Sequence, residues 1–371
     1  MILKNLKLVN FRNLENLTLD FQKNINIFIG KNAQGKTNVL ESIYFLAITK
    51  SHRTKNELNM IKNNTLFAKV SATYLNDDKN LNMLSILLNE KGKKVEVNNI
   101  AQRKISNYLS RLNVIMFCPD DLDIVKGSPS IRRRFLNVEL SQLKNNYLLE
   151  LKEYNLLLKQ RNEYLKQKNN AKFNRTYFDI LTKKLIAKNI NIVKMRYEFI
   201  EEINEFLSDI FNQIFESGNL TMEYKSFIEK EELLKDDIES IVYEKYQRLF
   251  TNELLQKTTL LGCHKDDFKM YLNDLSVTEF CSQGQQRLSV LSLKLAEIEV
   301  FIRKKNIYPI ILLDDIFSEL DENKKNNIIK YFNKDVQIFI TTTEIDDINE
   351  ELKNNSDIFI VKDGKVVKEE K

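Results

Sequence analysis

The chain has 371 residues, of which 43% are hydrophobic and 29% charged, and its formal net charge is +5. This composition is typical of a globular protein of two or three domains, and no apolar run approaches the roughly 18 residues of a membrane span. The 3 cysteines are scattered without a CxxC pair, which indicates neither a disulfide framework nor a zinc site. We therefore expect a cytoplasmic protein with no membrane partner.

The first 118 residues are expected to form mostly strands. Apolar residues alternate with polar ones near the N-terminus and again up to Ile29, and strand character returns at 67–74, 81–97 and 114–118. A single helix, over 36–47, interrupts these strands. Strands that surround one amphipathic helix indicate a sheet-based N-terminal region.

A helical insert is expected over 131–250, where apolar residues recur every three or four positions. Beyond it, apolar runs at 309–313, 336–341 and 357–361 predict strands separated by helices. This pattern is typical of a parallel sheet that a helical insert divides.

The strand that ends at Ile29 is followed by a complete phosphate-loop motif, G-x-x-x-x-G-K-[ST], which begins at Gly30. Its backbone N–H groups and the helix that follows can hold phosphate oxygens. We expect Lys36 to reach the β and γ phosphates of ATP, and Thr37 to offer its hydroxyl to Mg²⁺. The predicted nucleotide contacts are Gly30, Lys31, Asn32, Ala33, Gln34, Gly35, Lys36, Thr37 and Asn38.

A second part of the site is expected where the apolar run 310–313 ends in two adjacent acids. We assign Asp314 to Mg²⁺, through coordinated water, and Asp315 to the orientation or deprotonation of the attacking water. Taken alone, the segment could equally be a strand that ends in a solvated acidic turn. The phosphate loop favours the functional interpretation.

A helix start is predicted at Ser282, because Ser282 and Gln285 have the spacing of a capping box. A cap does not explain Gly284 in the first turn, since a helix has no need of glycine there. A serine hydroxyl, a glycine and a helix N-terminus can together hold a second phosphate group. Because the chain has one phosphate loop, we expect a second copy to use this site in trans.

Two of these segments resemble motifs of ABC ATPases. Residues 282–285 resemble the signature S-G-G-Q, with Gln283 in place of glycine, and 314–321 resemble D-E-x-x-S-x-L-D, which would make Asp321 the D-loop aspartate. The second acid of this pattern is usually glutamate. The shorter Asp315 is compatible with slow turnover.

Further motifs resemble the RecF family of recombination mediators over nearly the whole chain. They begin with Asn10-Phe11-Arg12-Asn13 and Ser51-His52-Arg53-Thr54, and continue with Pro119-Asp120-Asp121-Leu122, Lys126-Gly127-Ser128-Pro129, Arg132-Arg133-Arg134-Phe135-Leu136, Leu158-Lys159-Gln160-Arg161-Asn162 and Gly262-Cys263-His264-Lys265-Asp266-Asp267.

The resemblance implies an α/β fold, in which an ABC-type P-loop ATPase head with mixed sheets is split by a mainly helical second lobe. The head would comprise 1–118 and 256–371, and the lobe 119–255. It also implies weak ATP hydrolysis, an ATP-dependent homodimer and binding to single-stranded, gapped or junction DNA. RecR and RecO would be partners in loading RecA, in DNA repair, replication restart and the SOS response.

Two alternatives are an SMC-like ATPase head of another DNA pathway and the nucleotide-binding subunit of a transporter. The sequence shows neither long heptad repeats nor a separate metal-cluster domain, so it does not support the SMC-like alternative. The basic middle of the chain and the threonines at 341–343, where transporter subunits carry a switch histidine, argue against the second.

Three residues of these motifs have individual assignments. Arg12 and Arg53 are expected to contact the nucleotide, although Arg53 could be an ordinary surface residue, and His264 is expected to be structural or to lie at the edge of the nucleotide.

Candidate DNA contacts come from the charge distribution. Residues 131–200 hold 16 lysines and arginines against 6 acids, a charge of +10, whereas 201–250 hold 5 against 13, a charge of −8. The basic segment predicts contact with the DNA backbone. Arg132, Arg133 and Arg134 are the candidates, but three consecutive residues cannot all face one partner on a helix, so at least one should be structural.

Overall fold

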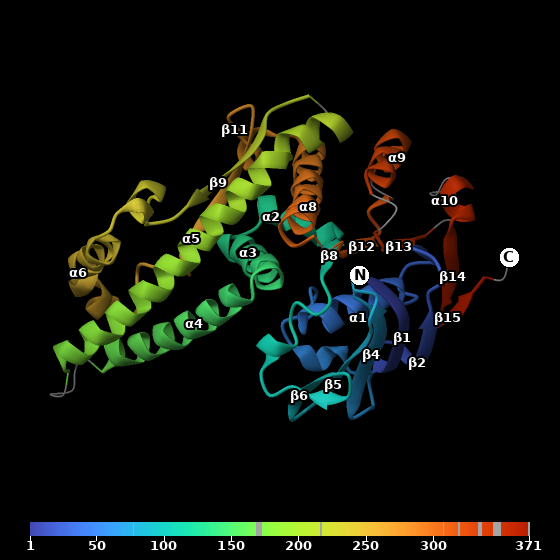
Figure 1. Ribbon diagram of the computed structural model, residues 1–371, viewed down its shortest axis with the longest axis horizontal. Coiled ribbons are helices and arrows are strands. Elements are labelled where there is room, and N and C mark those ends of the chain that lie inside the picture. Colours follow the sequence, from blue (N-terminus) through green and yellow to red (C-terminus); the bar gives the residue numbers. More distant parts are fainter. Residues whose placement is uncertain are drawn as a thin grey trace. The chain divides into compact units, whose positions relative to one another are not determined.

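The computed structural model describes the chain except for residues 77, 168–172, 216, 307, 318–319, 333–335, 344–349 and 370–371. Two compact units are distinguished by their internal packing (Figure 1). The first comprises 1–121, 213–216 and 294–371, and the second 122–212 and 217–293. The motifs predict domain boundaries at 119 and 256, which divide the chain by function. These boundaries stay a prediction.

The first unit contains an antiparallel sheet of six strands in the order β2-β1-β4-β5-β6-β7. The strands are β1 (Ile2–Phe11), β2 (Leu14–Asp20), β4 (Phe67–Leu75), β5 (Leu81–Asn89), β6 (Gly92–Val97) and β7 (Ile100–Ala101). Leu3, Leu6 and Leu8 are buried on one face. The alternation in the sequence therefore marks the core face of this sheet.

A second sheet of the same unit has the order β15-β14-β3-β13-β12-β8 and is parallel except for β15. Its strands are β3 (Ile25–Ile29), β8 (Val114–Phe117), β12 (Ile310–Asp314), β13 (Ile338–Thr342), β14 (Ser356–Lys362) and β15 (Lys365–Lys368). Every residue of β12 and β13 is buried, which is typical of a parallel strand covered on both faces. The carboxyl ends of β3, β13 and β12 meet at one edge of the sheet.

Helix α1 (Lys36–Ile48) follows β3 and contacts strands of both sheets. Most of its residues are buried, in agreement with its position between two layers (Figure 1). It begins after Gly35 and ends at Thr49, which has a left-handed φ of 61°. The unit also contains η1 (Glu57–Met60), η2 (Ile105–Asn107), α9 (Glu322–Tyr331) and α10 (Glu350–Asn354), and η3 (Pro119–Leu122) begins in it.

The second unit is mainly helical. Its helices are α2 (Asp123–Lys126), α3 (Pro129–Leu143), α4 (Asn145–Lys166), η4 (Lys230–Leu234), α6 (Ile238–Gln256) and α7 (Val277–Phe280), together with α5 (Arg175–Ile214) up to residue 212, and α8 (Gln283–Lys305) begins in it. Helices α4 and α5 run side by side (Figure 1), joined by an ion pair between Glu150 and Lys188.

One part of the helical expectation is wrong. Strand β9 (Leu220–Lys225) lies within 131–250 and pairs with β10 (Asp267–Leu272), which also pairs with β11 (Leu275–Ser276). Leu220, Met222 and Tyr224 are buried in strict alternation, a short period-two signal inside a long helical pattern. Its pairing partner lies beyond α6 in the sequence, so local spacing alone could not identify it.

Candidate functional site

The phosphate loop, residues 30–36, connects β3 to α1, and its two glycines are required by its geometry. A Cβ atom at Gly30 would lie 2.2 Å from the carbonyl oxygen of Val361 in β14. Gly35 has a φ of +115°, a backbone conformation that residues with a side chain rarely adopt. The two glycines of the sequence motif thus allow close packing at one end of the loop and a left-handed turn at the other.

Lys36 lies buried in this loop. Its Nζ donates hydrogen bonds to the carbonyl oxygens of Gly30 and Lys31, the latter at 3.1 Å. Burial lowers the pKa of Lys36, while the charges of Asp315 and Asp314 oppose that shift. A phosphate group that enters the loop could replace the carbonyl oxygens as partners of the ammonium group.

Asp314 ends β12 and accepts two hydrogen bonds on its Oδ1 atom. The hydroxyl of Thr37 donates at 2.9 Å and that of Thr341 at 2.8 Å. Burial raises the pKa of Asp314, and these two bonds partly offset the rise. The structure thus joins the hydroxyl that follows the phosphate loop to the acid at the end of β12, which lies two strands from β3 in the sheet and 277 positions away in the sequence.

The pair formed by Thr37 and Asp314 fits magnesium, because this cation prefers hydroxyl and carboxylate oxygens together with water and substrate phosphates. Over the part of the chain that the structure describes, no group of three or more histidine, cysteine and acidic residues could hold a metal by itself. Phosphate oxygens and water would therefore have to complete the coordination.

Asp315 differs from Asp314 in its backbone. Its φ of 54° is left-handed, and its N–H donates to the hydroxyl oxygen of Thr341 at 2.9 Å. Thr341 therefore supports both acids, since its oxygen accepts from one residue while its proton bonds the other. The water-activating role of Asp315 stays a prediction.

Contacts on the outer side of the phosphate loop were not predicted from the sequence. The carbonyl oxygen of Gln34 accepts hydrogen bonds from Asn13 Nδ2 at 3.2 Å and from the N–H of Gly364 at 3.1 Å. The N–H of Asp363 donates to the Gln34 side chain. The turn between β14 and β15 thus holds the loop.

Arg12 and Arg53 are brought to one buried acid, Glu41 of α1. Arg12 forms a two-pronged ion pair with it, and Arg53 Nη1 lies 3.5 Å from Glu41 Oε2. Arg53 also donates to Asn38 Oδ1 at 2.9 Å. Sequence reasoning missed Glu41, and its only signal was a charged residue within an apolar helix face.

The predicted signature segment lies in the second unit at the start of α8. Ser282 and Gln285 form the expected reciprocal bonds: Ser282 N–H donates to Gln285 Oε1 at 3.1 Å, and Gln285 N–H to Ser282 Oγ at 3.3 Å. Gln283 and Gly284 are exposed, and a Cβ atom at Gly284 would meet nothing closer than Ser282 Oγ at 3.9 Å. The helix start is confirmed, and the role of these residues in trans stays a prediction.

Asp321, the predicted D-loop residue, is exposed and precedes α9. Its Oδ1 accepts the N–H of Lys324 at 2.9 Å, and this bond lowers the pKa of Asp321. Ser318 and Glu319 of the same motif lie outside the described residues.

The three arginines of α3 have different surroundings. Arg132 forms a two-pronged ion pair with Asp267, at 2.6 and 2.9 Å, and donates to the carbonyl oxygens of Ile124 and Gly127. Arg132 is therefore structural. Arg133 donates to the Asp266 carbonyl at 2.9 Å, whereas Arg134 is exposed. DNA contact by these residues stays a prediction.

His264 belongs to the interior of the second unit. Its Nδ1 lies 2.6 Å from the Tyr154 hydroxyl and its Nε2 3.4 Å from the Thr259 carbonyl oxygen. Burial, then the positive charges of Lys265 and Arg133, lower the pKa of His264 to about 4. These contacts favour a structural role.

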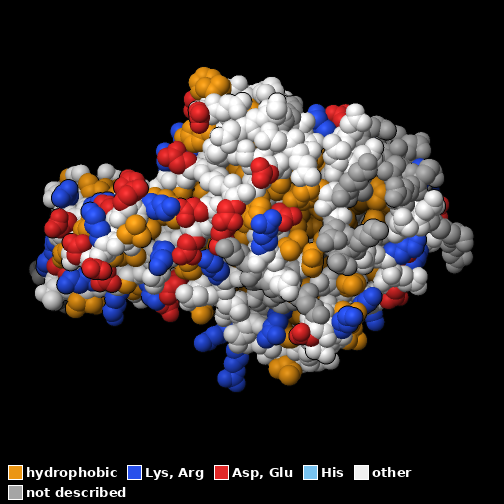
Figure 2. Space-filling view, turned by 45° about the horizontal axis from the view of Figure 1, so that its top comes forward, with side chains coloured by type: hydrophobic (Ala, Val, Ile, Leu, Met, Phe, Trp, Pro, Cys, Tyr) orange, Lys and Arg blue, Asp and Glu red, His pale blue; other side chains and the backbone are white. Residues whose placement is uncertain are grey.

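Charges of both signs cover the visible face of the long helices. Figure 2 shows lysine and arginine side chains interspersed with aspartate and glutamate over this part of the molecule. The excess of +10 in 131–200 therefore does not form a uniform basic surface on this face.

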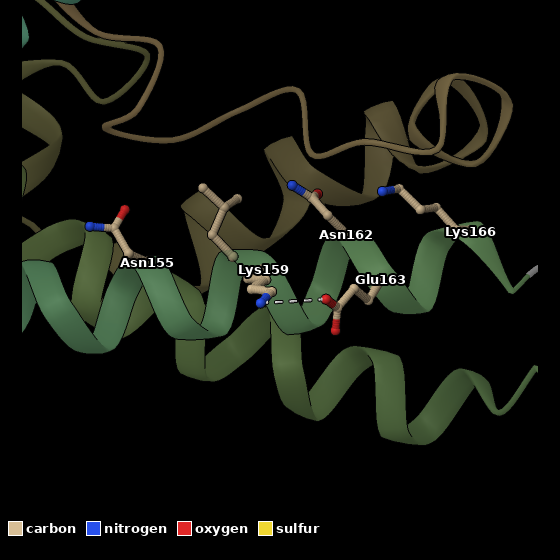
Figure 3. Close-up of a pocket in the computed structure, with 6 residues that line it drawn as sticks. Asn155, Lys159, Asn162, Glu163 and Lys166 are labelled. Atoms are coloured by element: carbon tan, nitrogen blue, oxygen red, sulfur yellow. Dashed lines mark ion pairs between the residues drawn. The ribbon is translucent and has the colours of Figure 1, made fainter. Parts of the chain in front are cut away.

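A pocket of about 370 Å³ lies along α4 (Figure 3). Lys159 and Glu163 form an ion pair across 4.0 Å within it, and Asn155, Asn162 and Lys166 line it further. Its lining is that of an ordinary exposed helix face, and we assign it no part in the phosphate site.

No helix of the described residues is long and apolar enough to cross a bilayer.

Comparisons with known proteins agree with these motifs. The family described as RecF/RecN/SMC N terminal domain matches residues 2–367. The DNA replication and repair protein RecF of Bacillus cereus strain G9842 is 39% identical over 369 residues, covering 99% of this chain and 98% of the relative. RecF of Bacillus anthracis strain CDC 684 / NRRL 3495 is also 39% identical, with the same coverage.

Solved structures give the same result. The recombination mediator protein RecF with ATP, of the RecFOR pathway, superimposes with a TM-score of 0.93 at 29% identity, covering 100% of this chain and 98% of that one. An SMC head bound to the C-terminal winged-helix domain of ScpA has a TM-score of 0.57 at 16% identity and shares the fold. The full-length match and the phosphate-loop geometry together show that this chain belongs to the RecF family.

Proposed function

We propose that this chain is an ATP-binding recombination mediator with ATPase activity, which acts on DNA in replication and repair. The observation that carries the proposal is the hydrogen bond between Thr37, at the end of the phosphate-loop motif, and Asp314. The chain that contains it superimposes over its whole length on RecF with ATP. We further infer that hydrolysis is weak and that it is coupled to dimerisation and DNA binding.

The residues of the phosphate site then have separate tasks. Lys36 exchanges its loop carbonyl partners for the β and γ phosphates, and the N–H groups at the start of α1 hold phosphate oxygens. Thr37 and Asp314 hold Mg²⁺, which when bound neutralises charge that develops on the phosphates. Asp315 orients or deprotonates the attacking water.

A second copy of the chain would complete the site. We infer that Ser282 and the following turn of α8, residues 283–285, contact the γ phosphate held by the partner, with Asp321 at the same interface. The exposure of Ser282 and Gly284 supports this arrangement, because a buried signature could not reach another copy.

The biological setting follows from the family. We propose that residues 1–118 and 256–371 act as the ATPase head and 119–255 as a helical lobe, and that the dimer binds single-stranded, gapped or junction DNA in the cytoplasm. RecR and RecO would be its partners in loading RecA, with roles in replication restart and the SOS response.

Sedimentation velocity with and without ATP and Mg²⁺, combined with binding to a gapped duplex at low salt, tests the proposal. The wild type should dimerise only with ATP and bind the gapped duplex more tightly in that state. Lys36→Arg should bind ATP but hydrolyse it more slowly, and Ser282→Arg should bind ATP without dimerising.

Two outcomes would contradict parts of the proposal. Undiminished dimerisation of Ser282→Arg with ATP would exclude the signature from the interface. Failure of the wild type to bind gapped DNA at low salt would refute the assignment to repair, whatever its ATP binding.

A further inference from the structure

Glu41 is an acid in an unusual place, the buried face of α1 one turn after Thr37. Its side chain is completely inaccessible to solvent. A carboxylate without water is costly unless cations and hydrogen-bond donors surround it. The partners of Glu41 therefore indicate why an acid is kept here.

Three donors meet the two oxygens of Glu41. Arg12 donates from Nε to Oε2 at 2.9 Å and from Nη2 to Oε1 at 2.6 Å, and the hydroxyl of Ser51 donates to Oε1. Arg53 Nη1 lies 3.5 Å from Oε2. Burial alone would raise the pKa of Glu41, but the bonds from Arg12 and Ser51 hold it below its usual value. Glu41 is thus a buried anion that binds two arginines.

The two arginines are not held equally. Arg12 is 19% exposed, and its remaining nitrogen, Nη1, donates to the Asn59 carbonyl oxygen at 2.8 Å, so its guanidinium is fixed on three sides. Arg53 is 42% exposed and donates through Nη1 to Asn38. Among the described residues, no hydrogen bond is formed by Nε or Nη2 of Arg53. Each nitrogen of Arg12 therefore already donates a hydrogen bond, whereas Nε and Nη2 of Arg53 are available as donors.

This cluster is joined to the phosphate loop. Asn38, the partner of Arg53, donates from Nδ2 to Asn13 Oδ1 at 2.8 Å, and Asn13 donates to the carbonyl oxygen of Gln34 in the loop. Ser51 also accepts the N–H groups of Arg53 and Thr54, which fixes the turn that carries Arg53. The available donors of Arg53 therefore lie on a turn held at the start of α1.

We propose that Glu41 is a positioning residue, which uses Arg12 as a fixed counter-charge and keeps Arg53 where its free N–H groups can bind the phosphates or ribose of a nucleotide. The inference depends on the proposed function, because it requires a nucleotide in the phosphate loop. It divides the expected roles of the two arginines: Arg12 holds the acid, and Arg53 contacts the ligand.

Equilibrium binding of a fluorescent ATP analogue to the full-length protein, together with thermal unfolding, tests this division. Arg53→Gln should weaken the affinity by about tenfold, the loss expected for one charge-assisted hydrogen bond. Glu41→Gln should weaken it by a similar factor. In the double variant the two losses should not multiply, because both remove the same contact.

Thermal unfolding separates positioning from simple stabilisation. Glu41→Gln should lower the unfolding midpoint equally with and without the Arg53→Gln change, while its effect on nucleotide affinity should disappear in the Arg53→Gln background. If Glu41→Gln does not fold, Glu41→Asp keeps the charge but shortens the side chain, and should show a smaller loss of affinity with the same dependence on Arg53. Glu15→Gln, which breaks the exposed pair with Lys62, is the matched control and should leave the affinity unchanged.

Two results would overturn the inference. One is an affinity within twofold of wild type in the folded Glu41 variants, and the other is full multiplication of the Glu41 and Arg53 losses. Lys36→Ala distinguishes this failure from a failure of the proposed function: if Lys36→Ala also binds the analogue normally, the phosphate loop is not the nucleotide site at all.

Discussion

Replacement of Thr341 by valine tests how the two adjacent acids are supported. Valine matches threonine in shape but has no hydroxyl, so the change removes the 2.8 Å bond to Asp314 and the 2.9 Å bond from the N–H of Asp315. Thr341 is only 1% exposed, so water cannot readily replace either bond. A bond to a charged group contributes about 1.5 to 3 kcal/mol, and an unpaired buried N–H costs about 1 to 3 kcal/mol.

Because Asp314 keeps its bond from Thr37, we expect the lower half of the combined range, about 3 kcal/mol. For a unit of roughly 200 residues this corresponds to a fall of about 6 to 12 °C in the unfolding midpoint. Turnover at saturating ATP should fall about tenfold to a hundredfold. This corresponds to a rise of about 1.4 to 2.8 kcal/mol in the activation free energy, because Asp315 would be placed less well in the transition state. ATP affinity should change less than turnover.

The assay measures steady-state ATP hydrolysis with gapped DNA, the affinity for a fluorescent ATP analogue, and thermal unfolding. Thr341→Ser keeps the hydroxyl and removes only a methyl group, so it should recover most of the turnover. A Thr341→Val protein with wild-type turnover and an unchanged unfolding midpoint would show that Thr341 does not support the acids.

Three further predictions concern other residues. Asp315→Asn should retain ATP binding but lower turnover at least a hundredfold, measured as phosphate release, because an amide cannot accept the proton of water. The pKa of His264 is lowered from 6.5 to about 4, so its contribution to stability is fully present above pH 6.5 and is lost as the pH falls through 4. Chemical denaturation should show a loss of about 3 kcal/mol between these pH values, and a smaller one in His264→Gln. Arg132→Gln should lower the stability of the second unit by about 2 kcal/mol, whereas Arg134→Gln should leave stability unchanged and reduce the salt dependence of DNA binding by about one unit of slope in titrations at several salt concentrations.

Features with a local cause could be predicted from the sequence. The phosphate loop is one, because its two glycines and Lys36 occupy fixed positions between a strand and a helix. The parallel strands are another, since residues buried on both faces give short, continuous apolar runs such as 310–313. The capping box at Ser282 depends only on a residue three positions away, and the structure confirms it.

Features that depend on distant partners could not be predicted in this way. Gln34 is held by Gly364, 330 positions later, and nothing near either residue indicates the pairing. Arg132 has the charge of a DNA contact, and only its partner Asp267 shows it to be structural. Glu41 was missed for the same reason, because its role depends on Arg12 and Arg53 from two other segments.

The presence of two aspartates at the end of β12 has a physical explanation in the backbone. Asp314 completes a strand and turns its carboxylate to the hydroxyls of Thr37 and Thr341. Asp315 then takes a left-handed φ of 54°, a conformation in which aspartate and asparagine are several-fold enriched, whereas longer side chains gain no such local compensation. A shorter acid than the usual glutamate therefore suits this backbone, and Thr341 supports it by accepting its N–H. On this argument, slow turnover would follow from the reach of the carboxylate rather than from a defect in the binding of phosphate.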